Sequence, residues 1–114
     1  MINNVMLVGR LATEVELEKD EYGEDIATIV LASPRGHKNK DGFYETDFID
    51  VELHGTIATH TKENVWKGDI IGVKGTLETY IKKDENETRI KCYKVVAEKL
   101  TWLSSKKTDI NEVE

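Results

Sequence analysis

The chain has 114 residues, which is the size of one domain, with 39% hydrophobic and 33% charged residues. No apolar run approaches the roughly 20 residues of a membrane-spanning helix, and residues 1–4 lack the basic start of a secretory signal. The one cysteine, Cys92, cannot form an internal disulfide, and we expect a cytoplasmic protein.

The formal net charge of −6 is unevenly distributed. We expect residues 14–25 to form a loop, and they contain seven acidic residues and one lysine, so the rest of the chain has as many bases as acids. Residues 32–44 carry three basic residues, one histidine and two aromatic residues against one aspartate. A strongly acidic chain is rarely a nucleic-acid-binding protein, but this distribution is compatible with a basic face.

Two short apolar segments, residues 5–8 and 26–32, predict the first two strands. We expect Gly9 to end the first of them. Both segments are apolar on both faces, which is typical of strands that are covered twice, by their own core and by another element or subunit.

Residues 48–54 alternate with period two, which predicts a third strand whose residues 49, 51 and 53 face the core. The opposite, outward row consists of Phe48, Asp50, Glu52 and His54. Residues 56–66 predict a helix of about three turns, because positions 57, 61 and 65 form one stripe. We expect Thr56 or Thr59 to cap this helix and Gly68 to end it.

Residues 69–82 predict a fourth strand that bends at its two glycines. Its inner row is Ile71, Val73, Leu77 and Ile81, and its outer row is Lys74, Thr76, Glu78, Tyr80 and Lys82. Residues 83–87 predict a polar hairpin tip, residues 88–100 a fifth strand, and residues 101–103 a cap on the core. Five strands with one helix between the third and fourth predict an all-β, five-stranded OB-fold barrel. We assign this domain to residues 1–104 and expect a disordered polar tail over 105–114.

Catalytic and metal sites find little support in the sequence. The three histidines, His37, His54 and His60, fit no zinc spacing, and Cys92 has no local signature of a nucleophile. No glycine-rich phosphate loop and no distinctive carboxylate pair is present. We therefore expect no enzyme activity, metal or cofactor.

The outward rows and residues 35–44 supply what a sequence-tolerant single-strand binder needs, namely cations along a backbone path and flat side chains for base stacking. The candidate DNA-binding residues are Arg35, His37, Lys38, Lys40, Phe43, Tyr44, Phe48, His54, Lys74, Tyr80 and Lys82, with Arg89 and Lys91 on one face of the fifth strand. The aromatic candidates could instead be packing residues, and single lysines are usually solvated. Asp50 and Glu52 argue against the hypothesis, because they share a row with Phe48 and repel phosphate.

Five blocks, residues 4–11, 26–32, 46–49, 67–69 and 73–77, resemble in order and spacing the bacterial single-stranded DNA-binding protein (SSB) family over residues 1–104. The resemblance implies an OB barrel that binds single-stranded DNA as a homotetramer, without catalysis or cofactor, and with the first strand at a dimer interface. It places the family's stacking positions at His37, Phe48, His54 and Lys82, near Tyr80, and its backbone-contacting cations at Arg10, Arg35 and Lys74.

The family's long tail with an acidic, aromatic tip is not matched, because residues 108–114 are acidic but short. The chain would then be a truncated member or a phage- or plasmid-like one. We predict a protein of DNA replication, recombination and repair, with single-stranded DNA, its own copies and replication or repair proteins as partners, and no membrane. Two alternatives stay open: a dimeric OB-fold replication-restart (primosomal) protein, and an adaptor that binds protein through residues 14–25.

Overall fold

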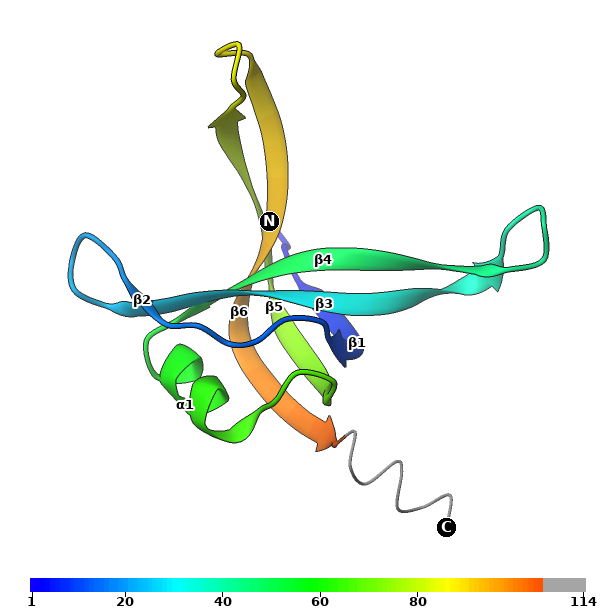
Figure 1. The fold of residues 1–114 in the computed structure, drawn as a ribbon, viewed down its shortest axis with the longest axis horizontal. Coiled ribbons are helices and arrows are strands. Elements are labelled where there is room, and N and C mark those ends of the chain that lie inside the picture. The colour runs from blue at the N-terminus through cyan, green and yellow to red at the C-terminus, as the bar shows by residue number, and fades with distance from the viewer. Residues whose placement is uncertain (106–114) are drawn as a thin grey trace.

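The computed structural model describes residues 1–105, which form six strands and one helix (Figure 1). The elements are β1 (Val5–Leu11), β2 (Glu18–Lys19), β3 (Asp25–Lys38), β4 (Tyr44–His54), α1 (Thr56–Asn64), β5 (Ile70–Lys83) and β6 (Arg89–Ser104). The sheet order is β1-β5-β6-β4-β3-β2, and an additional β1–β3 pairing closes five strands into a barrel. The predicted OB-fold class is therefore confirmed. The predicted tail lies outside the described residues, except for Ser105.

The core fills the barrel from the rows that alternation predicts. Ile29 and Leu31 of β3 and Val51 and Leu53 of β4 have no exposed surface. Helix α1 packs against β3, β4 and β6 and buries Ala58 and Thr61. Burial of this apolar set, at about 25 cal/mol per Å², is the main stabilising contribution to the barrel.

The predicted helix caps are wrong. Gly55, with φ 61°, occupies the N-cap position without a side-chain cap, and the helix ends at Asn64 with an extended Val65. Gly68, with φ 99°, lies beyond the helix in a turn, where its N–H donates to the Leu11 carbonyl. Glycine is favoured at both positions because φ is positive there. A threonine at the N-cap position could not adopt this φ without strain.

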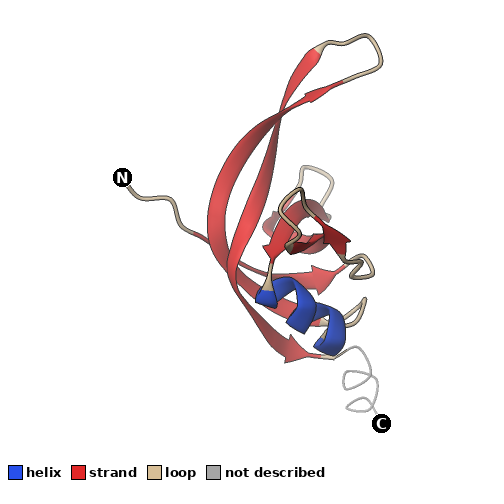
Figure 2. Ribbon diagram, turned by 90° about the vertical axis from the view of Figure 1, so that its left-hand side faces the viewer, coloured by secondary structure: helices blue, strands red, loops and turns tan. Residues whose placement is uncertain are grey.

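Two hairpins extend beyond the barrel and are longer than the sequence suggests. We call residues 33–47 the β3–β4 arm and residues 77–93 the β5–β6 arm; they project in different directions (Figure 1), and Figure 2 shows the β5–β6 arm rising away from α1. Leu77 and Ile81 were expected in the core, but they are 46% and 49% exposed. Their alternation continues that of Ile71 and Val73, but the strand has already left the barrel.

Strand β1 does not end at Gly9, as predicted, but continues across it to Leu11. A Cβ at Gly9 would lie 2.5 Å from the carbonyl oxygen of Ala32, so glycine permits the close β1–β3 approach that closes the barrel. The outer row of β1 is uncovered within residues 1–105, with Met6 77% and Val8 59% exposed. The described part of the single chain therefore does not supply the expected second cover of this strand.

Two further segments differ from expectation. Residues 101–103 do not cap the core but continue β6, and Trp102 is half exposed while its indole N–H donates to Asp69 Oδ2 at 3.3 Å. The acidic stretch 14–25 is not all loop, because its β2 pairs with β3. No helix within residues 1–105 has the length and apolarity needed to span a membrane.

Candidate nucleic-acid interface

Phe48 lies on the outside of the barrel, at the root of the β3–β4 arm. It pairs with Ala32, which pairs in turn with Arg10 of β1 at the closing seam. Paired residues of neighbouring strands share a face, so all three point outward. The Phe48 ring is 68% exposed, and the Arg10 guanidinium donates to the Gly68 carbonyl at 2.6 Å. Phe48 therefore offers an exposed ring face on the same outer surface as Arg10, two strands away.

The carboxylate of Glu52, in the same outer row as Phe48, is neutralised by its neighbours. Lys94 of β6 donates to Glu52 at 2.6 Å, and His54 Nε2 lies 2.6 Å from the other oxygen of the carboxylate. Partial burial alone would raise the pKa of Glu52, but these two hydrogen bonds outweigh it and hold the pKa below the ordinary 4.5. The ionised Glu52 carboxylate therefore stabilises the folded chain above pH 4.5, and this contribution is lost as the pH falls through the lowered pKa of Glu52.

His54 connects this row to the acidic stretch. Its Nδ1 lies 3.2 Å from Glu24, while its Nε2 contacts Glu52. Both ring nitrogens are thus engaged, and the side chain is 38% exposed. The sequence suggested a stacking ring here, whereas the contacts give His54 the role of a link between two carboxylates. Asp50 remains exposed and has no ion pair among the described residues.

Tyr80 extends the outer surface onto the β5–β6 arm. Its ring centroid lies 5.3 Å from Lys94 Nζ, the same ammonium that binds Glu52, so β4, β6 and β5 form one continuous surface. Desolvation raises the pKa of Tyr80, and the nearby Cys92 and Asp50 raise it further. Lys82 follows on the same face and lines a groove of roughly 700 Å³ that runs to the arm tip.

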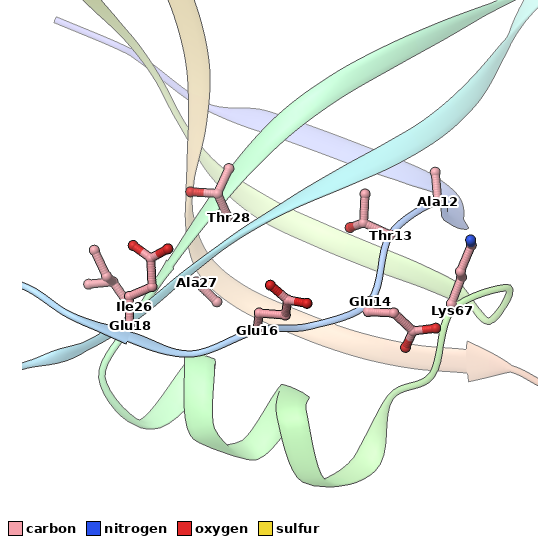
Figure 3. Close-up of a pocket in the computed structure, with 9 residues that line it drawn as sticks. All are labelled: Ala12, Thr13, Glu14, Glu16, Glu18, Ile26, Ala27, Thr28 and Lys67. Carbon is pink, nitrogen blue, oxygen red and sulfur yellow. The ribbon is translucent and has the colours of Figure 1, made fainter.

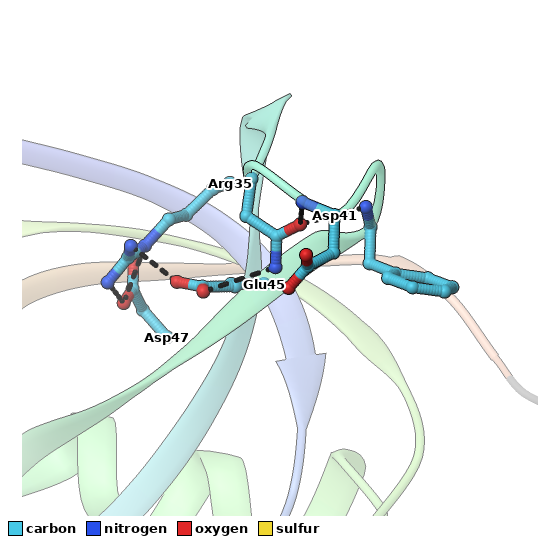
Figure 4. Close-up of polar contacts among 6 residues, drawn as sticks. Arg35, Asp41, Glu45 and Asp47 are labelled. Atoms are coloured by element: carbon cyan, nitrogen blue, oxygen red, sulfur yellow. Dashed lines mark hydrogen bonds and ion pairs between the residues drawn. The ribbon is translucent and has the colours of Figure 1, made fainter.

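The β3–β4 arm carries two exposed aromatic residues at its end. Phe43 and Tyr44 are 69% and 58% exposed, and Lys38 lies 5.8 Å from the centroid of the Tyr44 ring. The side-chain oxygen of Asn39 accepts hydrogen bonds from the backbone N–H groups of Asp41 and Phe43 and fixes the turn (Figure 4). His37 and Lys40 are exposed nearby.

Arg35 is occupied by carboxylates of its own arm. Its guanidinium contacts Asp47 at 3.0 Å and Glu45 at 2.7 Å (Figure 4). The hydrogen bond that Arg35 donates to Asp47 raises the pKa of Arg35 and, reciprocally, lowers the pKa of Asp47. Asp47 pairs with Ser33, one step from the Ala32–Phe48 pair, so Arg35 and Phe48 lie on opposite faces of the arm.

Three more predicted cations lie away from Phe48. Lys74 pairs with Met6 of β1 and borders a groove of roughly 300 Å³ beside the exposed apolar row. Arg89 and Lys91 pair with Lys83 and Ile81, which places them on the other face of the β5–β6 arm from Tyr80. The sequence listed these cations together with Phe48 as candidate DNA-binding residues, and the register places them apart from it.

Lys94 is a residue that sequence reasoning missed. It contacts both Glu52 and Tyr80 and so joins the two strands that carry the aromatic candidates. The alternation of residues around the buried Val95 could have predicted that the Lys94 side chain points outward. Its contacts with Glu52 and Tyr80 could not be predicted, because they depend on the β4–β6 register.

An acidic groove of roughly 480 Å³ lies on another part of the barrel, between strand β3 and the segment that follows β1 (Figure 3). Its charged lining residues are Glu14, Glu16, Glu18 and Lys67. Three carboxylates against one ammonium repel phosphate, so this groove bounds any DNA path rather than continuing it. Among residues 1–105, no three side chains of His, Cys, Asp or Glu are grouped to hold a metal ion.

Known proteins resemble this chain in sequence and in fold. Residues 2–103 match the model of the single-strand binding protein family. The chain is 33% identical over 112 residues to single-stranded DNA-binding protein 1 of Staphylococcus aureus, covering 98% of this chain and 72% of that protein. It is 36% identical over 106 residues to the single-stranded DNA-binding protein of Streptococcus pneumoniae, covering 93% and 68%.

A solved structure titled "Plasmodium falciparum SSB complex with ssDNA" has the same fold, with a TM-score of 0.81 at 21% identity, over 91% of this chain and 96% of that one. The family match spans nearly all of the described residues, and the barrel, the arms and the outer aromatic surface all lie within it. The chain therefore belongs to the single-strand binding protein family.

Proposed function

We propose that this chain binds single-stranded DNA with little regard to sequence and shields DNA that is exposed during replication, recombination and repair. The observation that carries the proposal is the continuous outer surface on which the rings of Phe48 and Tyr80 alternate with Lys94 and Lys82. The family relatives, which are named as single-stranded DNA-binding proteins, support it.

The mechanism combines two physical terms. Lysines of the outer surface and of the β3–β4 arm attract the phosphate backbone, and bases of any identity stack on exposed rings, each stack contributing about 1–3 kcal/mol. Neutralisation of Glu52 by Lys94 reduces the repulsion that its carboxylate would exert on phosphate. The role needs no catalytic group and no cofactor, and we place it in the cytoplasm, with residues 1–104 as the binding domain.

A titration with oligo-dT, followed by tryptophan and tyrosine fluorescence, tests this function. We expect tight binding at low salt and a linear fall of log affinity with log salt, with a slope of about −0.7 for each phosphate neutralised. Binding that is absent at low salt, or that does not respond to salt, would contradict the proposal.

We further propose that the chain assembles into a homotetramer, with the outer row of β1 at one interface. Met6 and Val8 form an exposed apolar strip that continues along the groove beside Lys74, and such a strip on an OB barrel favours burial against another copy. The native mass should be about four times the 13.0 kDa of one chain and should fall for Met6→Glu. A stable dimer would favour the replication-restart alternative. A monomer would exclude both the proposed homotetramer and the dimeric replication-restart protein.

The acidic groove supports a second candidate function, an adaptor that binds a basic partner protein. Its three glutamates lie on the surface of the barrel and are separate from the aromatic surface. In that case the chain would capture protein through residues 14–25 and would fail the oligo-dT titration at every salt concentration.

A further inference from the structure

The β5–β6 arm has two faces with different side chains. Cross-strand pairs place Tyr80 opposite Cys92 and Lys82 opposite Ile90, on the face that continues the outer surface. The alternate pairs are Leu77–Val95, Thr79–Tyr93, Ile81–Lys91 and Lys83–Arg89. Because paired residues share a face, these four pairs form a second face that continues the core side of the barrel.

The second face carries an aromatic ring, apolar side chains and cations. Tyr93 is 58% exposed, between the exposed Leu77 and Ile81. Lys83, Arg89 and Lys91 lie farther out on this face and form no ion pair within residues 1–105. The face has no acidic residue, because Glu78 belongs to the Tyr80 face and the other carboxylates of the arm lie at its tip.

Burial changes abruptly along this face, which excludes a role in the core. Val95 is 2% exposed, whereas Leu77, its partner across the pair, is 46% exposed and Tyr93 more so. The arm stands clear of the barrel in both ribbon views (Figure 1, Figure 2), so the ring of Tyr93 does not stabilise the core. An exposed ring followed by three cations, without an acid, is complementary to a base and its phosphates.

We propose that Tyr93 stacks a base and that Lys91 and Arg89 contact phosphates, so that a long single strand passes around the β5–β6 arm and uses both of its faces. This inference rests on the proposed function and deepens it, since it adds the second face of the arm to the binding surface. It also assigns a purpose to the two cations that the register separates from Phe48.

The test compares variants of the full chain in titrations with oligo-dT of about 16 nucleotides, the upper end of the site size of one OB barrel. We expect Tyr93→Ala to weaken binding about tenfold and Tyr93→Phe, which keeps the ring, to bind like the unchanged protein. Tyr22→Ala is the matched control, because Tyr22 is 87% exposed on the acidic stretch and should not contact DNA. Thermal unfolding verifies that each variant is folded.

A second variant tests the cations independently of the ring. The double change Arg89→Ala/Lys91→Ala should reduce the salt slope by about 1.4, which is 0.7 for each phosphate that the variant no longer neutralises. The inference is overturned if both variants bind like the unchanged protein while Phe48→Ala is weakened, an outcome that leaves the proposed function standing. It is also overturned if Tyr93→Ala alters the native mass without altering affinity, because the face is then a contact between copies. Failure of the unchanged protein to bind oligo-dT instead contradicts the proposed function itself.

Discussion

Replacing Phe48 with alanine is expected to weaken oligo-dT binding by roughly 1–3 kcal/mol, which is about 5- to 150-fold in affinity. The ring is 68% exposed and projects from the outer row of β4, so its removal costs little core packing. Its loss removes a stacking platform at the root of the β3–β4 arm, on the same outer face as Arg10. Unfolding by urea should be unchanged within about 0.5 kcal/mol.

The control for Phe48→Ala is Phe48→Trp, which keeps a flat ring and should retain affinity. Tyr22→Ala controls for the loss of an exposed aromatic residue elsewhere, since Tyr22 lies among acidic residues. If Phe48→Ala binds as tightly as the unchanged protein, Phe48 is not in the binding site, and the outer row of β4 loses its proposed role.

Replacing Gly75 with alanine should destabilise the barrel by about 3 kcal/mol or more, the upper part of the range for overpacked positions. A Cβ at this position would lie 2.1 Å from the carbonyl oxygen of Val96 and 2.9 Å from its carbonyl carbon. Both atoms belong to the backbone of β6, so no side chain can move to relieve the clash. Gly75 also follows a register irregularity between β5 and β6, where the two strands approach.

The matched control for Gly75→Ala is Gly36→Ala. No atom lies within 4 Å of a Cβ at Gly36, and its φ is not positive, so this change should alter the free energy of unfolding by no more than about 1 kcal/mol. Urea unfolding of both variants measures the difference. Equal stability of the two variants would contradict the close β5–β6 approach on which the position of the β5–β6 arm depends.

The sequence predicted the barrel because alternation reports which row of a strand is buried. The prediction held for Val51 and Leu53, where both the strand and its neighbours remain in the barrel. It failed for Leu77 and Ile81, because the same alternation continues after the strand has left the core. Where a strand becomes an arm depends on how its neighbours close, and no local pattern contains that information.

The candidate site was predictable as a set of residue types but not as an arrangement. The outward direction of the Phe48 side chain followed from the period of two. The placement of Arg35 on the other face of the arm from Phe48, in contrast, depends on the β3–β4 register. Ion pairs were invisible for the same reason: Arg35 binds Asp47 and Glu45 across the hairpin, and Lys94 binds Glu52 from a strand that is distant in sequence.

The most direct test of the central claim is a competition between single-stranded and duplex DNA of the same length for the unchanged protein at low salt. A surface that works by stacking needs unpaired bases, so a labelled oligo-dT should be displaced by unlabelled single strand and poorly by duplex. If duplex competes as well as single strand, binding is due to charge alone, and the proposed role of the Phe48–Tyr80 surface is contradicted.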